Sequence, residues 1–190
     1  MIDYKPLNPE TWKDFEILFG PRGAYAGCWC MWWRTTRKEF EKCQGDGNKA
    51  ALHALVEAGR VPGIIGYHEG RPAAWAAICP RGDFPSSGRS RLLKPVDDRP
   101  VWSLPCLFVG KEFRGENLSL AMIEAAVDYV KKQGGKIVEA YPTVPRDSSG
   151  GGKLPPVSSF MGFPAVFVKA GFTEVARPSE ARMIMRLEIA

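Results

Sequence analysis

The segment from residue 27 to residue 34, GCWCMWWR, gathers side chains that could serve a metal site, a redox site, a buried core or a pocket wall. It holds two thiols, three indoles and one thioether. A structural zinc site needs about four ligands, normally with cysteine pairs two to four residues apart. The tight pair Cys28-x-Cys30 has only Cys43 as a further thiol nearby, no histidine lies close, and a CxxC redox motif is absent. We therefore expect no metal.

The indoles of this segment leave two interpretations open. Trp and Met side chains stabilise a core through the area that they bury. Exposed to a cleft, the same indoles can stack on a ring or hold an ammonium group. Trp29 and Trp33 are four residues apart and share a face if the segment turns helically. Part of the segment is expected to pack inward and part to line a pocket.

A second candidate site is the junction FVGKEFRGENLSLAMIEAA, where an apolar strand ends, a short loop follows and a helix is expected from about Glu116. The first amides of a helix are unpaired and carry a partial positive charge, so they can hold a phosphate group. Arg114 adds a fixed cation. Because many α/β crossovers share this pattern without binding anything, the junction alone predicts only a candidate phosphate site.

Other catalytic arrangements are not supported by the sequence. His53 and His68 are the only histidines, and both are expected at the surface rather than as ligands or bases. No serine has the context of a nucleophile elbow, so a Ser-His-Asp hydrolase is not predicted.

The elements that position these residues follow from periodicity and end signals. The hairpin signal is Glu69-Gly70, between two strands of PGIIGYHEGRPAAWAAICP, and 81–99 is expected to be a loop. The Gly/Ser tract 148–152 is expected to be a mobile flap. Strands are expected over 2–7, 62–68, 71–80, 101–109, 137–141, 172–176 and 182–189. Helices are expected from Pro9 to 19, from 36, over 48–59, 116–133 and about 160–170.

The resulting order, β-α-α-β-β-β-α-β-α-β-β, predicts an α/β fold with a mixed sheet and helices on both faces. A chain of 190 residues with 45% hydrophobic and 25% charged residues is expected to form a single globular domain over 1–190. Its five scattered cysteines fit reduced thiols. The start of the chain lacks a secretory signal pattern, and no run approaches the roughly 18 apolar residues of a membrane helix. We therefore expect a soluble, cytoplasmic protein that does not bind a membrane.

The sequence resembles the GCN5-related N-acetyltransferase (GNAT) family. The resemblance lies in the junction RGENLS at 114–119, in EAYP at 139–142 and in VKAGF at 168–172, and the order of elements fits over nearly the whole chain. The family's signature at the junction is R/Q-x-x-G-x-G/A, whose backbone amides hold the pyrophosphate of acetyl-CoA. The resemblance therefore implies a GNAT-like fold with acetyl-CoA as acyl donor. The implied donor-binding residues are Phe108, Val109, Arg114, Gly115, Glu116, Asn117, Leu118 and Ser119.

The chain departs from the family pattern at four positions. Asn117 and Ser119 stand where glycine or alanine is usual, although Asn tolerates unusual backbone angles and both side chains are short. Phe167 stands where many members place a tyrosine that protonates the departing thiolate. Many members of the family have a glutamate base at a position that falls near Ser103 in this chain. Ser103 is therefore a candidate catalytic residue by its position alone.

The resemblance implies other groups for the chemistry. The backbone N–H near Val109 would polarise the thioester, while Glu139 and Tyr141, on one face of their strand, would act as base and acid. The alternative is that Glu139 is an ordinary polar strand residue and Tyr141 part of the core. The segment between the first two helices lies over the acceptor side of such folds. It makes Cys28, Trp29, Met31, Trp32 and Trp33 the candidate substrate-binding residues.

The sequence thus predicts an acetyl-CoA-dependent N-acetyltransferase that transfers acetyl to a primary amine of a small molecule or peptide by direct attack. One alternative is a non-catalytic acyl-CoA-binding or sensor module, which the absent tyrosine and the altered glycines favour. Another is a nucleic-acid- or protein-binding domain that uses the net charge of +5. No single Lys/Arg block stands out, and an acidic cofactor explains the charge equally well, so a nucleic-acid partner is not favoured. A homodimer is left open, because many relatives pair through edge strands.

Overall fold

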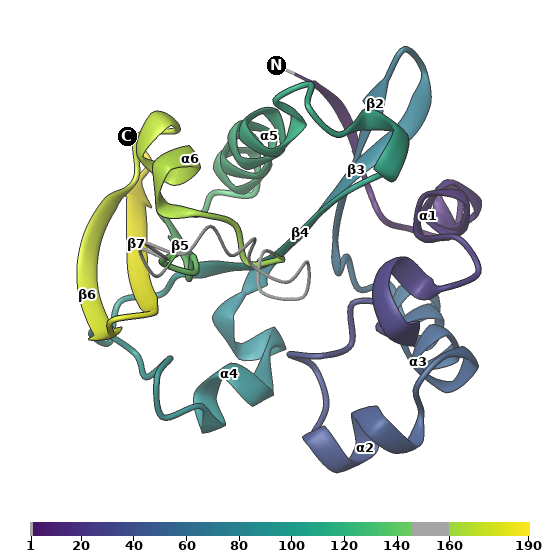
Figure 1. Cartoon of the computed structure of the whole chain (residues 1–190), viewed down its shortest axis with the longest axis horizontal. Helices are drawn as coiled ribbons and strands as arrows, with labels where there is room; N and C mark the ends of the chain where they lie inside the picture. The colour runs from purple at the N-terminus through teal and green to yellow at the C-terminus, as the bar shows by residue number, and fades with distance from the viewer. Residues whose placement is uncertain (1, 146–159) are drawn as a thin grey trace, which may run out of the picture.

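The computed structural model describes residues 2–145 and 160–190. One seven-stranded sheet runs through them in the order β1-β2-β3-β4-β5-β7-β6 (Figure 1). Only the β4–β5 pair is parallel, so the sheet is mixed as predicted. The strands are β1 (Asp3–Pro6), β2 (Gly63–His68), β3 (Arg71–Pro80), β4 (Trp102–Val109), β5 (Ile137–Ala140), β6 (Thr173–Ser179) and β7 (Arg182–Glu188).

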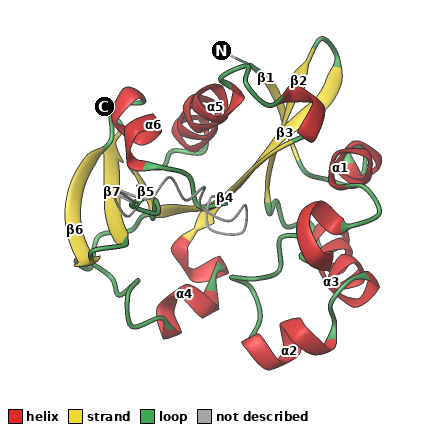
Figure 2. Cartoon of the chain, in the orientation of Figure 1, coloured by secondary structure: helices red, strands yellow, loops and turns green. Residues whose placement is uncertain are grey.

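Helices lie on both sides of this sheet (Figure 2). The α-helices are α1 (Trp12–Phe19), α2 (Arg37–Lys42), α3 (Asp46–Glu57), α4 (Pro85–Arg89), α5 (Leu118–Lys132) and α6 (Pro164–Lys169). Single helical turns, η2 (Arg81–Asp83) and η3 (Lys111–Phe113), follow β3 and β4, and the irregular turn η1 (Gly23–Gly27) follows α1. The predicted mobile flap at 148–152 lies outside the described residues.

The predicted order of elements is wrong in two places. Three α-helices separate β1 from β2, where the predicted order counts two although a short helix from 36 is expected, and α4 separates β3 from β4, where a loop is predicted. The miscounted helices are short. Because α2 and α4 have six and five residues, neither is long enough to show a helical period in its sequence. At α2 the expected capping box is present, since Thr36 and Glu39 each satisfy a backbone amide of the other.

The sheet is buried on both faces because alternate residues of β3 enter different cores. Ala74, Ala76 and Ile78 pack with α5 and α6 in one cluster. Trp75, Ala77 and Cys79 pack with α1 and α3 in the other. This explains the uninterrupted apolar run 73–79, since a strand covered on both sides needs no polar alternation. The hairpin at Glu69-Gly70 is confirmed, and both residues have positive φ, as a tight two-residue hairpin turn requires.

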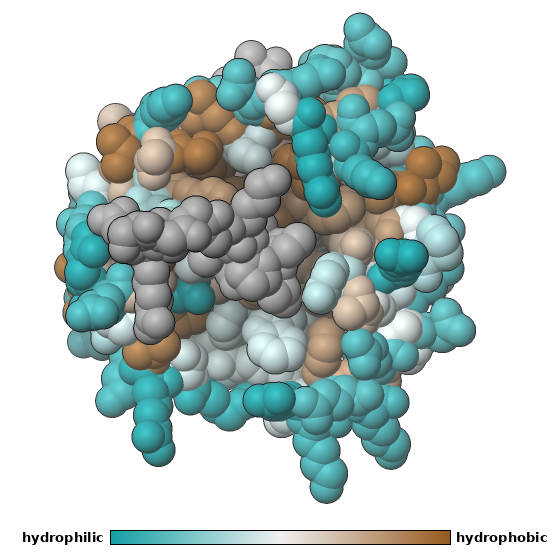
Figure 3. Space-filling view, viewed as in Figure 1, coloured by the Kyte–Doolittle hydropathy of each residue, from teal (hydrophilic) through white to brown (hydrophobic). Residues whose placement is uncertain are grey.

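The face of the molecule drawn in Figure 3 is mostly polar, with apolar side chains gathered near α6 and near α1. Val168 of α6 is 60% exposed and Ile17 of α1 is 61% exposed. Within the described residues, no helix combines the length and hydropathy needed to cross a membrane.

Candidate acyl-transfer site

The candidate site lies where β4 and β5 separate. The two strands pair only from Trp102↔Val138 to Leu104↔Ala140. Beyond this point Pro105 interrupts the register on β4 and Pro142 follows the end of β5, while β4 continues along β3 as far as Val109. A proline donates no backbone hydrogen bond, so it weakens a ladder where it occurs. Among the described residues, no strand therefore pairs with this edge of β4 beyond Leu104 (Figure 1).

The open edge of β4 presents alternate backbone amides. Gly110 N–H points toward β3, because it donates to the Ala73 carbonyl at 2.8 Å. Leu107 N–H points the other way and donates to the Phe160 carbonyl at 2.7 Å. Since amides alternate along a strand, Val109 N–H faces the same open edge as Leu107. The direction of the Val109 N–H bond is thus compatible with the prediction that an amide near Val109 polarises the thioester of the acyl donor.

The start of α5 supplies further amides. The helix begins at Leu118, two residues later than expected, because Asn117 is in the left-handed conformation with φ 56° and ψ 18°. Asparagine tolerates this conformation better than most residues other than glycine. The Asn117 carbonyl accepts from Leu120 and Ala121, as at the start of a helix, so the amides of Leu118 and Ser119 have no partner within the helix.

The side chains around this helix start have a mixed charge. No acidic residue lies in the first turn of α5. Arg114, Gly115, Glu116 and Asn117 are exposed, whereas Leu118 is buried against Ala73 and Phe113. Glu116 Oε2 lies 3.0 Å from His68 Nε2. The unpaired amides of this start suit a phosphate group, which needs donors and a positive potential.

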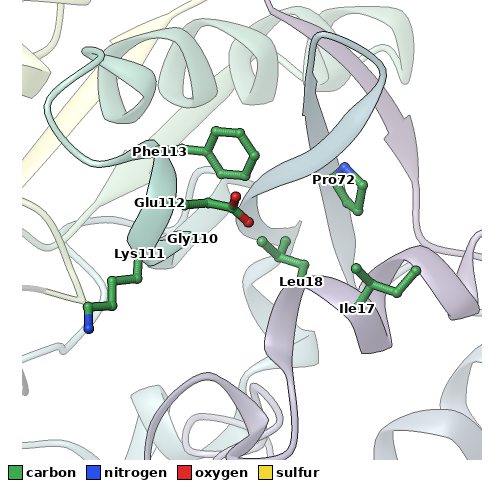
Figure 4. A pocket seen from close by; sticks show the side chains of 7 residues that line it. All are labelled: Ile17, Leu18, Pro72, Gly110, Lys111, Glu112 and Phe113. Atoms are coloured by element: carbon green, nitrogen blue, oxygen red, sulfur yellow. The ribbon is translucent and has the colours of Figure 1, made fainter.

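A cavity of about 430 Å³ lies beside the carboxyl end of β4 (Figure 4). Ile17 and Leu18 of α1 form one wall, and η3 with Phe113 forms the opposite wall. The lining residues are Ile17, Leu18, Pro72, Gly110, Lys111, Glu112 and Phe113.

The three predicted catalytic side chains, Ser103, Glu139 and Tyr141, come together just before the strands separate. Ser103 on β4 is paired in register with Glu139 on β5, and Tyr141 lies two residues further on the same side. The Tyr141 hydroxyl lies 2.7 Å from Ser103 Oγ and donates to Glu139 Oε1 at 2.7 Å. All three side chains are fully buried. Burial, followed by the charge of Glu139, raises the pKa of Tyr141 above its usual range.

Two guanidinium groups complete this cluster. Arg81 Nη1 donates to Glu139 Oε1 at 2.6 Å and to the Tyr141 hydroxyl at 2.8 Å. Arg186 Nε donates to Glu139 Oε2 at 2.8 Å, and its Nη1 donates to Asp97 at 2.7 Å. Each oxygen of Glu139 is therefore held by a cation. Asp97, which lies between α4 and β4, is therefore also part of the cluster.

This geometry does not suit the roles of base and acid that the sequence analysis gave to Glu139 and Tyr141. A general base must reach the proton that it removes, directly or through one water. Glu139 is 0% exposed and both its oxygens already accept from arginines. Tyr141 is also 0% exposed, and its hydroxyl is shared between three partners. Phe167, which stands where a tyrosine is usual, is buried in the α5–α6 core against Phe172.

Sequence reasoning missed both arginines of the cluster. Arg186 had a signal, because a charged residue inside the apolar strand RMIMRLE needs a buried partner. Arg81 had no comparable signal, since it follows the end of β3 in a stretch that reads as a loop.

The aromatic and thiol segment is divided between core and surface. Trp29 and Met31 are buried in the α1–α3 core, where Trp29 stacks on Phe19 with ring centroids 5.8 Å apart. Cys28 and Trp33 are half-buried, and Trp32 is 38% exposed. In the described part of the chain, no group of three or more His, Cys, Asp or Glu side chains could hold a metal ion.

The acetyltransferase (GNAT) family matches residues 27–149, about two thirds of the chain. The chain belongs to this family. Its matched region contains β4, α5 and β5, and so includes both the separated strands and the start of α5. A search of the curated proteins found no match.

Solved structures of GNAT acetyltransferases share the fold of this chain. A GNAT-family acetyltransferase from Listeria monocytogenes is 14% identical, with a TM-score of 0.58 over 99% of this chain and 95% of that one. A Drosophila melanogaster polyamine N-acetyltransferase that forms N-acetylagmatine is 15% identical, with a TM-score of 0.55 over 100% of both chains. The PaiA N-acetyltransferase from Thermoplasma acidophilum, in complex with coenzyme A, is 11% identical, with a TM-score of 0.52 over 100% of this chain and 99% of that one.

Replacing Glu139 by Gln in this GNAT protein should strongly lower its stability. The substitution keeps the side-chain shape but removes the charge that Arg81 and Arg186 share, and breaking a buried ion pair costs about 3–5 kcal/mol. Urea denaturation followed by tryptophan fluorescence measures the loss.

The matched control for this substitution is Glu41→Gln, which removes an exposed carboxylate paired with Arg37 on α2. It should leave the denaturation midpoint nearly unchanged, because exposed pairs contribute little. Equal effects of the two substitutions would contradict the structural role given to Glu139.

Proposed function

We propose that the protein is an acetyl-CoA-dependent N-acetyltransferase that acts on a primary amine of a small molecule or a peptide. The observation that carries the proposal is the separation of β4 from β5 beside a helix start with unpaired amides. Such a site offers a strand edge for an extended chain and donors for a phosphate group at one end of it. Family membership supports acetyl transfer in general terms.

The donor is proposed to lie along the open edge of β4. The amides of Leu118 and Ser119 and the side chain of Arg114 hold the pyrophosphate, while Gly115, Glu116 and Asn117 shape the loop around it. Phe108 and Val109 flank the pantetheine chain. Val109 N–H polarises the thioester carbonyl, because it faces the open edge and the amide of Leu107 already donates to Phe160.

The reaction that we propose is direct attack. The neutral amine nitrogen attacks the thioester carbon, the carbon–sulfur bond breaks, and coenzyme A leaves as the thiolate while water takes the proton from nitrogen. Positioning and carbonyl polarisation supply the rate enhancement. In this scheme Ser103, Glu139 and Tyr141 are positioning residues that hold β4 and β5 together at the base of the cleft, which replaces the earlier assignment of a base and an acid.

The acceptor is proposed to approach from the side of the aromatic segment. Cys28, Trp32 and Trp33 keep exposed surface there, whereas Trp29 and Met31 support them from the core. An indole face attracts a cation, which suits the ammonium form of an arriving amine. Agmatine is a first acceptor to test, since solved structures with this fold include an agmatine N-acetyltransferase.

Three broader expectations accompany the proposal. The five free cysteines suit a reducing compartment, so we propose a cytoplasmic location. The chain is proposed to act as one domain over 1–190. A homodimer through an edge strand, β1 or β6, stays a prediction.

A non-catalytic acyl-CoA-binding or sensor module is the alternative function. It is favoured by the burial of Glu139 and Tyr141, which keeps both of these candidates for base and acid away from a bound substrate. Both functions require a site that binds the acyl donor, so only a measurement of turnover distinguishes them.

The test of turnover uses acetyl-CoA with a labelled acetyl group and a panel of agmatine, other polyamines and peptides with free N-termini. Labelled product should form on at least one amine, with one free thiol released per acetyl transferred. Binding of coenzyme A with no product on any acceptor, and no slow hydrolysis, would support the module instead.

Arg114→Ala should weaken coenzyme A binding by about tenfold or more, because a hydrogen bond to a charged group contributes about 1.5–3 kcal/mol. Isothermal titration calorimetry measures the affinity. Lys38→Ala is the control, since Lys38 is an exposed cation on α2, at the opposite end of the molecule from α5 (Figure 1). Unchanged affinity in Arg114→Ala, or equal losses in both variants, would contradict the proposed phosphate contact.

A further inference from the structure

A second cavity, of about 420 Å³, lies on the side of the sheet that faces the α1–α3 core. Buried Met31 and Cys79 form its floor, and exposed Arg60 lies at its rim. Cys79 pairs with Ser103 near the start of β4, whereas the open edge of β4 begins beyond Leu104. The second cavity and the proposed donor site therefore lie toward opposite ends of β4.

Arg34 brings to this cavity a charge that no carboxylate pairs with in the described part of the chain. Its Nη1 donates to the Asp83 carbonyl at 3.3 Å, and its Nη2 donates to the Pro62 carbonyl at 2.8 Å and to Cys79 Sγ at 3.3 Å. The Asp83 carboxylate pairs with Arg60 instead. A guanidinium has more N–H donors than these three acceptors use, and the Arg34 Nε–H is buried without an acceptor among the described residues. Because a half-buried charge without a counter-charge is costly, this side chain favours an anionic ligand.

The guanidinium group of Arg34 is held in place without a ligand. Its Cζ lies 4.5 Å from the centroid of the Phe84 ring, and Phe84 is buried. This stacking and the hydrogen bond to the Pro62 carbonyl fix the plane of the group. A donor that is already fixed loses little conformational entropy when a ligand binds, which favours affinity.

The other lining side chains limit the kind of anion that fits. Leu55 and Val61 are apolar, while Arg34 and Arg60 with Asp83 give the lining two guanidinium groups and one carboxylate, a net charge of +1. One carboxylate balances this charge, whereas a phosphate monoester carries close to two negative charges. The planar fork of an arginine also matches the geometry of a carboxylate.

We propose that this cavity is a binding site for a small monocarboxylate. The carboxylate pairs with Arg34, and the apolar chain or ring of the ligand contacts Leu55, Val61 and Met31. The volume of the cavity lies in the range of small-molecule sites, about 300–1,000 Å³.

This site does not depend on the proposed acetyl transfer. Of its lining residues, only Met31 has a part in that function, where it supports the aromatic segment from the core. Binding of a carboxylate and binding of coenzyme A are therefore measured separately, and a failure of either proposal is recognisable by itself.

The test titrates the ¹⁵N-labelled full-length protein with hexanoate and follows its amides by two-dimensional NMR. The amides of 51–55 and 81–84, which surround the cavity, should shift and reach saturation. Hexanamide, which has the same chain without the charge, is the second probe. It should bind about tenfold more weakly or worse, because hydrogen bonds to a charged group are stronger than neutral ones.

Two alanine substitutions on α3 assign the site. Ala51→Leu should abolish the shifts caused by hexanoate, because Ala51 lines the cavity and the larger side chain takes the space of the ligand. Ala54→Leu makes the same change at an exposed position of the same helix and should leave the shifts intact. Arg34→Met should lower the affinity for hexanoate to that of hexanamide. If Arg34→Met does not fold, the two probes and the two alanine variants still decide the outcome.

Equal affinities of hexanoate and hexanamide for the wild-type protein would overturn the proposal. Retained binding in Ala51→Leu, or no binding at millimolar concentration, would also overturn it. Shifts confined to Val109 and 115–119 would place hexanoate in the donor site instead and would count against the second cavity.

Discussion

The buried carboxylate of Glu139 is the interaction on which the site depends. It lies on β5, an inner strand of the sheet, and the two guanidinium groups that hold it come from η2, directly after β3, and from β7. Arg81 also donates to the Leu93 carbonyl, and Arg186 binds Asp97, so the loop between β3 and β4 is held by the same cluster. Removing charges from water is costly and is compensated only when every charged group finds partners. Glu139 meets this condition, since both oxygens accept charge-assisted hydrogen bonds.

This cluster also determines where the sheet opens. The hydroxyl groups of Ser103, on β4, and Tyr141, directly after β5, meet beside Leu104↔Ala140, the last pair before the strands separate. Beyond it the two strands belong to different surroundings, because β4 continues along β3 while Tyr141 packs with Met161 and Ile184 in a separate small cluster. The edge of β4 that has no β5 partner therefore begins beside a buried polar cluster, and β4 then leads through η3 to the start of α5.

Much of the fold could be predicted from the sequence, because long strands and α5 carry strong periodic or uninterrupted apolar patterns. The short helices α2 and α4 could not be counted reliably, and the start of α5 is shifted by the left-handed Asn117, which no local pattern specifies. The spacing of Glu139 and Tyr141 predicts that they lie on one side of their strand. It does not predict that arginines cover this side, because Arg81 and Arg186 are distant in the sequence. Burial of Trp29 and Met31 likewise depends on how η1 turns the chain, which tertiary packing decides.

The central claim is that a donor binds along the open edge of β4, with the amide of Val109 facing it. Two-dimensional amide NMR of the labelled protein during a titration with coenzyme A tests this claim directly. If the donor binds there, the Val109 resonance and those of 115–119 should shift together with one affinity, while amides of α2 stay unchanged. Shifts confined to other regions, with the Val109 resonance unmoved at saturation, would contradict it.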